Sequence, residues 1–194
     1  MAWPGVPLSR ERTVAERRMP ESALNPLMVA QARVLSGALA CHIGFDYRNA
    51  AVTRKENEVF DTWQRAILAT RAFNTIGVHD YYFPDRAVNG WSFTTYLSHI
   101  QELARAAGCD KCPIWITETG YVSHPQKAGT RIDPGSPQNQ AEWARQAFRQ
   151  AFDLGVERMY WLFLKDHPNG RYFDSMGLLD ANGNPRPALS VIAR

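Results

Sequence analysis

The sequence lacks a long apolar run, a strong net charge and a set of paired cysteines. No apolar stretch approaches the length of about 18 residues that a membrane-spanning helix needs, so no transmembrane segment is predicted. The formal net charge of the 194 residues is only +3, which favours neither a nucleic acid nor a membrane surface as a partner. The first residues contain no charged region followed by a continuous apolar stretch, so no signal peptide is predicted and the localisation stays open.

Three cysteines are too few for a disulfide framework. Cys109 and Cys112 form a CxxC pair, a spacing that also occurs in redox sites and in halves of zinc sites. The pair lies in a turn that enters an apolar strand, and a zinc site needs four convergent ligands. A local disulfide or ordinary packing in the turn fits this position better. We expect neither a metal nor a cofactor.

Three helices are predicted from apolar residues that recur at i, i+3 and i+4. The second begins after Ser92 as N-cap, and the third begins at Ser136-Pro137, a cap followed by proline at the first helical position. Gly108 and Gly155 are expected to end these two helices. The predicted ranges are 58–71, 93–107 and 137–154, and a last helix is expected to begin near residue 187.

Four short apolar runs alternate with these helices and are predicted to be strands: 33–40, 75–79, 113–116 and 158–164. The order β-α-β-α-β-α-β predicts an α/β fold with a parallel sheet, either doubly wound or part of a (β/α)8 barrel. A complete barrel is excluded because eight βα units need roughly 200–250 residues. Residues 1–32 are interrupted by prolines and are expected to form an irregular N-terminal extension.

Polar side chains stand where three of these strands end. Glu118 follows the third strand, and His79 and Tyr81 follow the second at a spacing that puts them on one face. Because the carboxyl ends of parallel strands form one edge, these groups are expected to meet there. A phenol and an imidazole can orient a carboxylate and keep it ionised, as a nucleophile requires. Further residues of these strand ends are candidates for substrate binding: Tyr82, Trp161, Lys165 and Asp166.

Each of these residues also has an ordinary structural explanation. Trp161 fits barrel packing, His79 fits a satisfied core histidine, and Lys165 with Asp166 fits a surface ion pair. Taken singly, the structural explanation is the safer one. Taken together on three neighbouring strand ends, the residues favour a functional site.

The sequence resembles the C-terminal half of the large superfamily of retaining glycoside hydrolases with (β/α)8 barrels, whose catalytic glutamates follow strands four and seven. The segment Trp115-Ile-Thr-Glu-Thr-Gly120 resembles the seventh strand with its nucleophile and is the most specific match. The resemblance covers about residues 32–188 and includes cellulase-like and xylosidase-like relatives. It implies that residues 33–194 form half of a TIM barrel with about four parallel strands. Segments 33–40, 76–83 and 159–166 resemble strands five, six and eight, and 176–188 is similar to the family's usual ending.

The resemblance implies that Glu118 is the nucleophile, that His79 and Tyr81 orient it, and that Trp161 lines the subsite of the sugar being cleaved. The implied partner is a carbohydrate, a β-linked oligosaccharide or polysaccharide. The family's acid/base glutamate follows an asparagine at the end of strand four, and that strand is not in this sequence. Asn57-Glu58 has the right dipeptide but precedes a helical pattern, so Asn57 is predicted to be an N-cap and Glu58 a first-turn acid.

Two functions from different classes therefore stay open. The first is a retaining glycosidase that is a fragment or works with its missing half supplied elsewhere, because the mechanism needs two carboxyl groups about 5–5.5 Å apart. The second is a non-catalytic carbohydrate-binding or structural remnant of such a barrel. A phosphate-handling enzyme is disfavoured because no glycine-rich segment precedes a predicted helix. In either case the open edges of half a barrel are expected to promote self-association.

Overall fold

The computed structural model describes residues 35–36, 39–40, 50–81, 91–128, 131–168 and 172–193. The chain divides into two units, Met1–Arg33 and Val34–Arg194. The first unit lies outside the described residues, so the irregular N-terminal extension stays a prediction.

The second unit alternates strands and helices in the predicted order. Its core elements are β1 (Leu39–Ala40), α2 (Ala50–Thr70), β2 (Ile76–His79), α3 (Phe93–Ala106), β3 (Ile114–Thr119), α4 (Pro137–Asp153) and β6 (Val156–Trp161). A two-stranded antiparallel hairpin, β4 (Gln126–Ala128) and β5 (Arg131–Asp133), follows β3. After β6, the chain continues through a 3-10 turn, η3 (Tyr172–Ser175), to a short helix, α5 (Pro187–Ile192).

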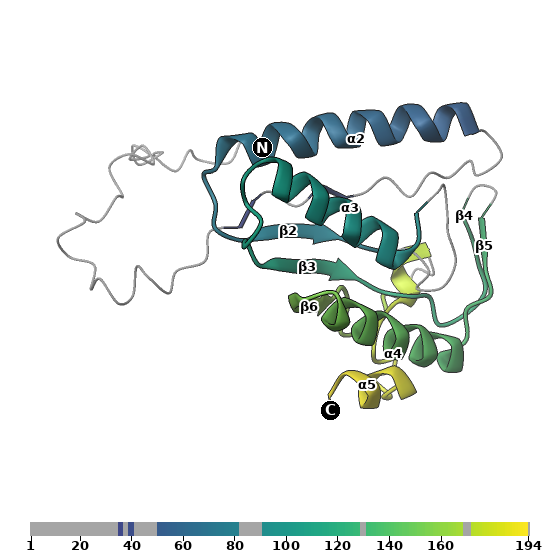
Figure 1. The fold of residues 1–194 in the computed structure, drawn as a ribbon. Helices are drawn as coiled ribbons and strands as arrows, with labels where there is room; N and C mark the ends of the chain where they lie inside the picture. Colours follow the sequence, from purple (N-terminus) through teal and green to yellow (C-terminus); the bar gives the residue numbers. More distant parts are fainter. Residues whose placement is uncertain are drawn as a thin grey trace, which may run out of the picture. The chain divides into compact units, whose positions relative to one another are not determined.

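The four core strands form one parallel sheet in the order β1-β2-β3-β6 (Figure 1). Strand order therefore follows chain order, and each connection between neighbours contains a helix. This is the arrangement of a partial (β/α)8 barrel, in which the helices lie on one face of the sheet. The predicted fold class, α/β with about four parallel strands, is confirmed.

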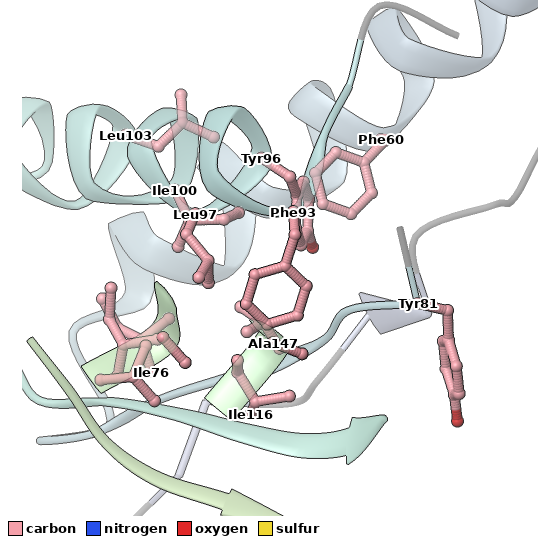
Figure 2. Packing of buried hydrophobic residues seen from close by; sticks show 14 of the residues in the cluster. Phe60, Ile76, Tyr81, Phe93, Tyr96, Leu97, Ile100, Leu103, Ile116 and Ala147 are labelled. Atoms are coloured by element: carbon pink, nitrogen blue, oxygen red, sulfur yellow. The ribbon is translucent and has the colours of Figure 1, made fainter. Parts of the chain in front are cut away.

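One apolar core joins the sheet to α2, α3 and α4. Ile76 and Ile116 are fully buried, and they belong to the same cluster as Phe60 of α2, Leu97 of α3 and Ala147 of α4 (Figure 2). Because residues of alternate parity point to opposite faces of a strand, this cluster occupies one face of the sheet. The helices share that face, which excludes the doubly wound alternative, where helices cover both.

The predicted helix caps of α3 and α4 are present. Ser92 accepts a hydrogen bond from the backbone N–H of Thr95, whose hydroxyl in turn contacts the N–H of Ser92 at 2.7 Å. Ser136 accepts from the N–H of Asn139 at 3.0 Å, with proline next to it at the first helical position. These side chains satisfy N–H groups that a helix start otherwise leaves unpaired.

The predicted boundaries of one helix and two strands are wrong. Helix α2 begins at Ala50, so Asn57 is not an N-cap and Glu58 is not a first-turn acid; both lie inside the helix. The extra turns consist mainly of alanine and charged residues, which favour helix without an apolar stripe. Strand β6 covers Val156–Trp161 rather than 158–164, and β3 extends past the predicted end at 116 to Thr119.

Cys109 and Cys112 form the local disulfide that was one of two interpretations of the CxxC pair. It closes the turn between α3 and β3, at the end of β3 opposite to Glu118. Within the described residues, no group of three or more His, Cys, Asp or Glu side chains could hold a metal ion. No helix in that part of the chain is long and apolar enough to cross a membrane.

Candidate active site at the carboxyl end of the sheet

Glu118 is the penultimate residue of β3, at the carboxyl end of the sheet. The pairing of β2 with β3 shifts just before it: Val78 pairs with Ile116, but His79 pairs with Glu118. This irregularity places the glutamate directly beside His79. The sequence predicted that these two residues would share an edge, and the register now gives the reason why they face each other.

Tyr81 and His79 both contact the same oxygen of Glu118. The Tyr81 hydroxyl donates a hydrogen bond to Oε2 at 3.0 Å, and His79 Nδ1 lies 3.2 Å from that oxygen. The histidine atom makes no hydrogen bond of acceptable geometry, so its contact with the carboxylate is electrostatic. Figure 2 shows Tyr81 at the rim of the apolar cluster with its hydroxyl pointing away from it. The Glu118 side chain remains 38% exposed, which leaves it accessible to a ligand.

The protonation states of the two neighbours follow from burial and from the carboxylate. Burial raises the pKa of Tyr81, and the charge of Glu118 and its hydrogen bond raise it further. Burial lowers the pKa of His79, and the charge of Glu118 opposes this effect only in part. At neutral pH, Tyr81 therefore stays a hydrogen-bond donor, and His79 is mainly neutral. The carboxylate is oriented by a phenol that keeps its proton.

Trp161 has a packing role in this structure. Its indole N–H donates to the carbonyl of Met176 at 2.6 Å, and its ring packs edge-on against Trp143 of α4 at 5.9 Å. The side chain is partly buried against the apolar core. This is the structural explanation that the sequence left open, and the role of Trp161 in lining a sugar subsite stays a prediction.

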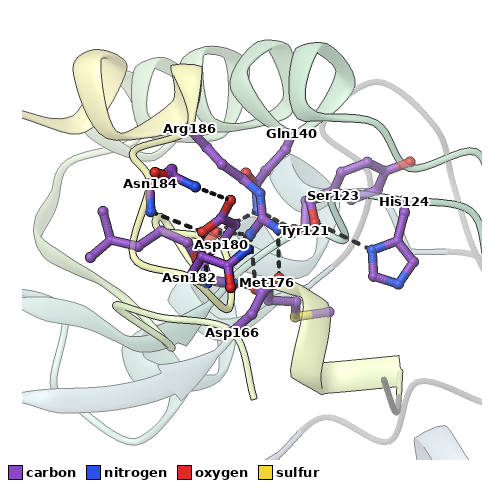
Figure 3. Close-up of polar contacts among 12 residues, drawn as sticks. Tyr121, Ser123, His124, Gln140, Asp166, Met176, Asp180, Asn182, Asn184 and Arg186 are labelled. Carbon is purple, nitrogen blue, oxygen red and sulfur yellow. Dashed lines mark hydrogen bonds and ion pairs between the residues drawn. The ribbon is translucent and has the colours of Figure 1, made fainter. Parts of the chain in front are cut away.

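Asp166 is paired, but with a different residue from the one expected. Its carboxylate binds the Arg186 guanidinium through two contacts, 2.5 Å and 2.8 Å long (Figure 3). It also accepts a hydrogen bond from the N–H of Gly177 at 2.8 Å. The side chain is 8% exposed, so this pair is an internal tether and not the predicted surface pair with Lys165. Lys165 itself is exposed, and its role in substrate binding stays a prediction. Tyr82 lies outside the described residues.

Gln140, whose side chain is fully buried, was not among the predicted site residues. Its amide donates to the carbonyl of Tyr121 at 2.9 Å and to that of Gly177 at 3.2 Å, which ties the segment after β3 to the segment after β6 (Figure 3). A glutamine on the apolar face of α4, in line with Ala144, was a signal that a polar contact crosses the core.

No second carboxyl group contacts Glu118 within the described residues, where its hydrogen bonds and ion pairs involve Tyr81 and His79. Glu58, the tempting substitute for the acid/base, is exposed in the interior of α2.

Comparisons with known proteins give partial likeness in structure. No protein-family model matches the chain, and no curated protein matches it. A β-glucuronidase of Faecalibacterium prausnitzii is 18% identical over 62% of this chain and 21% of its own, with a TM-score of 0.43. A family 17 β-1,3-glucanosyltransferase of Rhizomucor miehei is 11% identical over 74% of this chain and 58% of its own, with a TM-score of 0.46.

A monomeric β-xylosidase of Caulobacter crescentus is 14% identical over 68% of this chain and 30% of its own, with a TM-score of 0.48. The chain thus spans less than two thirds of the length of each of these proteins. All three names are those of carbohydrate-active enzymes, and the likeness concerns part of the fold.

Proposed function

We propose that this chain carries the nucleophile half of a retaining glycoside hydrolase site that acts on a β-linked oligosaccharide or polysaccharide. The observation that supports this best is the setting of Glu118: an accessible carboxylate at the carboxyl end of a parallel strand, bound by Tyr81 and flanked by His79. In such a mechanism, a carboxylate attacks the anomeric carbon and forms a covalent glycosyl-enzyme, which water then hydrolyses.

The two oxygens of Glu118 have different roles in this proposal. Both neighbours contact Oε2, whereas Oε1 makes no hydrogen bond or ion pair within the described residues. Oε2 is therefore the anchored atom, and Oε1 is the atom that attacks. Tyr81 fixes the orientation of the carboxylate and, because burial keeps the proton on its oxygen, it adds no second negative charge. Positioning of this kind supplies much of the rate that an enclosed site provides.

The described residues that contact Glu118 are Tyr81 and His79, so the proposal takes the general acid from outside the described part of the chain. A natural glycan has a poor leaving group, so the missing acid should cost about 10²–10⁴-fold in rate. A sugar with an activated leaving group needs no proton donor for the first step. The isolated chain is therefore expected to form the glycosyl-enzyme with activated substrates and to turn over natural glycans poorly or not at all.

The test uses the full chain and a panel of 2-deoxy-2-fluoroglycosyl fluorides, in which the fluoride leaves readily and the second step is slow. Peptide mass mapping should find the label only on the peptide that contains Glu118, and Glu118→Ala should abolish it. Glu102→Ala, which removes an exposed carboxylate from α3, is the matched control and should keep the label. Labelling that persists in Glu118→Ala, or brisk hydrolysis of an unactivated glycan by Glu118→Gln, would show that the nucleophile is wrongly assigned.

A non-catalytic carbohydrate-binding role is the second candidate, and one observation favours it. Within the described residues, the hydrogen-bond and ion-pair partners of Glu118 are Tyr81 and His79, and neither is a carboxyl group. If the chain only binds sugar, glycans should shift the NMR signals of His79 and Tyr81, whereas no fluoroglycoside should label Glu118. Labelling of Glu118 rules this candidate out.

The proposal also includes self-association of the chain through the open edges of the sheet. Among the described strands, β1 and β6 are the edges of the sheet, and the tyrosine at position 160 of β6 is 42% exposed. Parallel sheets are normally covered on both faces, and an open edge is a template for pairing. We expect the chain to self-associate, so sedimentation should show a species that grows with concentration. A compact, stable monomer at every concentration would contradict this.

A further inference from the structure

The irregularity that aims Glu118 is a bulge of one residue in β3. Val78 pairs with Ile116 and His79 pairs with Glu118, so Thr117 is an extra residue on β3 at this point. Bulges bend a strand and often redirect a side chain beside an active site. A ladder without the extra residue would pair His79 with Thr117 and turn Glu118 to the other face. The bulge is therefore what brings the glutamate to its two neighbours.

Two threonine hydroxyls fasten β3 to β2 on either side of Glu118. The hydroxyl of Thr117 donates to the carbonyl of Val78 at 3.1 Å, and the hydroxyl of Thr119 donates to the carbonyl of Asp80 at 2.7 Å. Between them, the N–H of Asp80 donates to the carbonyl of Glu118 at 3.1 Å. Thr119 is fully buried, so water cannot replace its hydroxyl easily.

The second of these bonds also acts on the partner of Glu118. Asp80 immediately precedes Tyr81, so the position of the Asp80 carbonyl sets where the Tyr81 backbone leaves the sheet. The carbonyl of Thr119 accepts from the N–H of Leu162 at 2.8 Å, which anchors the same residue to the segment after β6. Thr119 thus connects three strand ends around the carboxylate.

We infer that the hydroxyls of Thr117 and Thr119 are positioning groups that hold the bulge, and with it the Glu118 carboxylate, against Tyr81 and His79. The inference adds two residues to the machinery of the proposed function and rests on that function only where Glu118 is treated as a nucleophile. Valine has nearly the shape of threonine but donates no hydrogen bond, and serine keeps the hydroxyl. The pair of substitutions therefore separates the hydrogen bond from the packing.

The first measurement is the pKa of His79, followed by NMR of its ring in the full chain. The chain has 5 histidines, and His79→Gln assigns the signal. In Thr119→Val, the carboxylate that raises the pKa of His79 should move away while the burial that lowers it remains, so the pKa should fall further. Thr119→Ser should keep the wild-type value. Thr62→Val, which removes a similar hydroxyl-to-carbonyl bond on the exposed side of α2, should change nothing.

The second measurement is the rate at which a 2-fluoroglycosyl fluoride labels Glu118. A displacement of about 1 Å can cost about 10²-fold, so labelling of Thr119→Val should be slower by at least roughly 10-fold, and serine should restore it. A change in the His79 pKa with no labelling of any variant, wild type included, would support the positioning role and reject the proposed hydrolase.

A folded Thr119→Val whose His79 pKa equals that of the wild type would overturn the inference. If Thr119→Val does not fold, Thr117→Val replaces it in both measurements. Thr117 is only partly buried, and its substitution removes the hydrogen bond from the Thr117 hydroxyl to the Val78 carbonyl. An unchanged His79 pKa in that variant would overturn the inference equally.

Discussion

Replacing Arg186 by methionine would leave the Asp166 carboxylate buried without its cation. The two side chains are 12% and 8% exposed, and they meet through two contacts at 2.5 Å and 2.8 Å. The guanidinium also donates to the carbonyls of Gly177 and Leu179 at 2.8 Å and 3.3 Å. The pair therefore holds the segment before α5 against the segment after β6.

The expected cost of Arg186→Met is about 4 kcal/mol in the free energy of unfolding. Removing one partner of a buried ion pair typically costs about 3–5 kcal/mol, since the remaining charge has lost its compensation. For a chain of this size, about 4 kcal/mol lowers Tm by roughly 8–16 °C. Replacing both partners by apolar residues is often close to neutral. The variant that combines Asp166→Leu with Arg186→Met should therefore be more stable than Arg186→Met alone, although the Gly177 N–H then loses its acceptor.

Urea unfolding followed by tryptophan fluorescence and circular dichroism measures all four corners of this cycle. The matched control is Arg149→Met in α4, whose pair with Asp153 is exposed and 3.8 Å long, and it should change stability by at most about 0.5 kcal/mol. A cost below about 1 kcal/mol for Arg186→Met, or a double variant whose cost equals the sum of the single costs, would refute the buried-pair reasoning.

Three further variants test local features by the same unfolding assay. Burial and Glu118 raise the Tyr81 pKa above 10.0, so this tyrosine contributes stability that is complete below about pH 10 and lost as pH rises further; Tyr81→Phe should lack that alkaline loss. Ser136→Ala removes the N-cap of α4 and should lower the free energy of unfolding by about 1 kcal/mol. An unchanged stability would show that this cap does not stabilise the helix. Gly177→Ala would place its Cβ against the Asp166 backbone nitrogen and should cost about 1–3 kcal/mol; a neutral result would contradict that tight approach.

The parts of the fold that the sequence predicted correctly are those fixed by local patterns. Ser92 and Ser136 precede clear apolar periodicity, and a cap followed by such a pattern specifies where a helix begins without reference to the rest of the chain. The continuous apolar run at Ile114–Ile116 identifies a strand buried in a parallel sheet for the same reason.

The start of α2 and the β4–β5 hairpin were missed because their signals are weak. The first turns of α2 follow helix propensity without an apolar stripe, so the amphipathic pattern begins only near residue 58. The hairpin strands are three residues each, too short for alternation to be distinguished from a loop. Local sequence patterns therefore identify neither the start of α2 nor the hairpin.

Some contacts of the candidate site were likewise predictable from the sequence, and others were not. The meeting of Glu118 with His79 and Tyr81 was predictable, because parallel strands bring their carboxyl ends to one edge. The partner of Asp166 was not, because the sequence offered the adjacent Lys165 whereas the structure pairs it with Arg186, 20 residues further on. Nothing in the local pattern distinguishes a neighbour in sequence from a neighbour in space.

Within the described residues, the contacts that orient Glu118 and hold its bulge come from β2, β3 and the residues that follow β2. Strand β3 has β2 on one side and β6 on the other, so the bonds that orient the glutamate and hold its bulge are complete without a further strand. A missing barrel half would adjoin β1 and β6 at the sheet edges and would leave the β2–β3 pairing unchanged. In the proposed function, formation of the covalent intermediate therefore depends on this chain. Protonation of a natural leaving group depends on whatever covers the open edges.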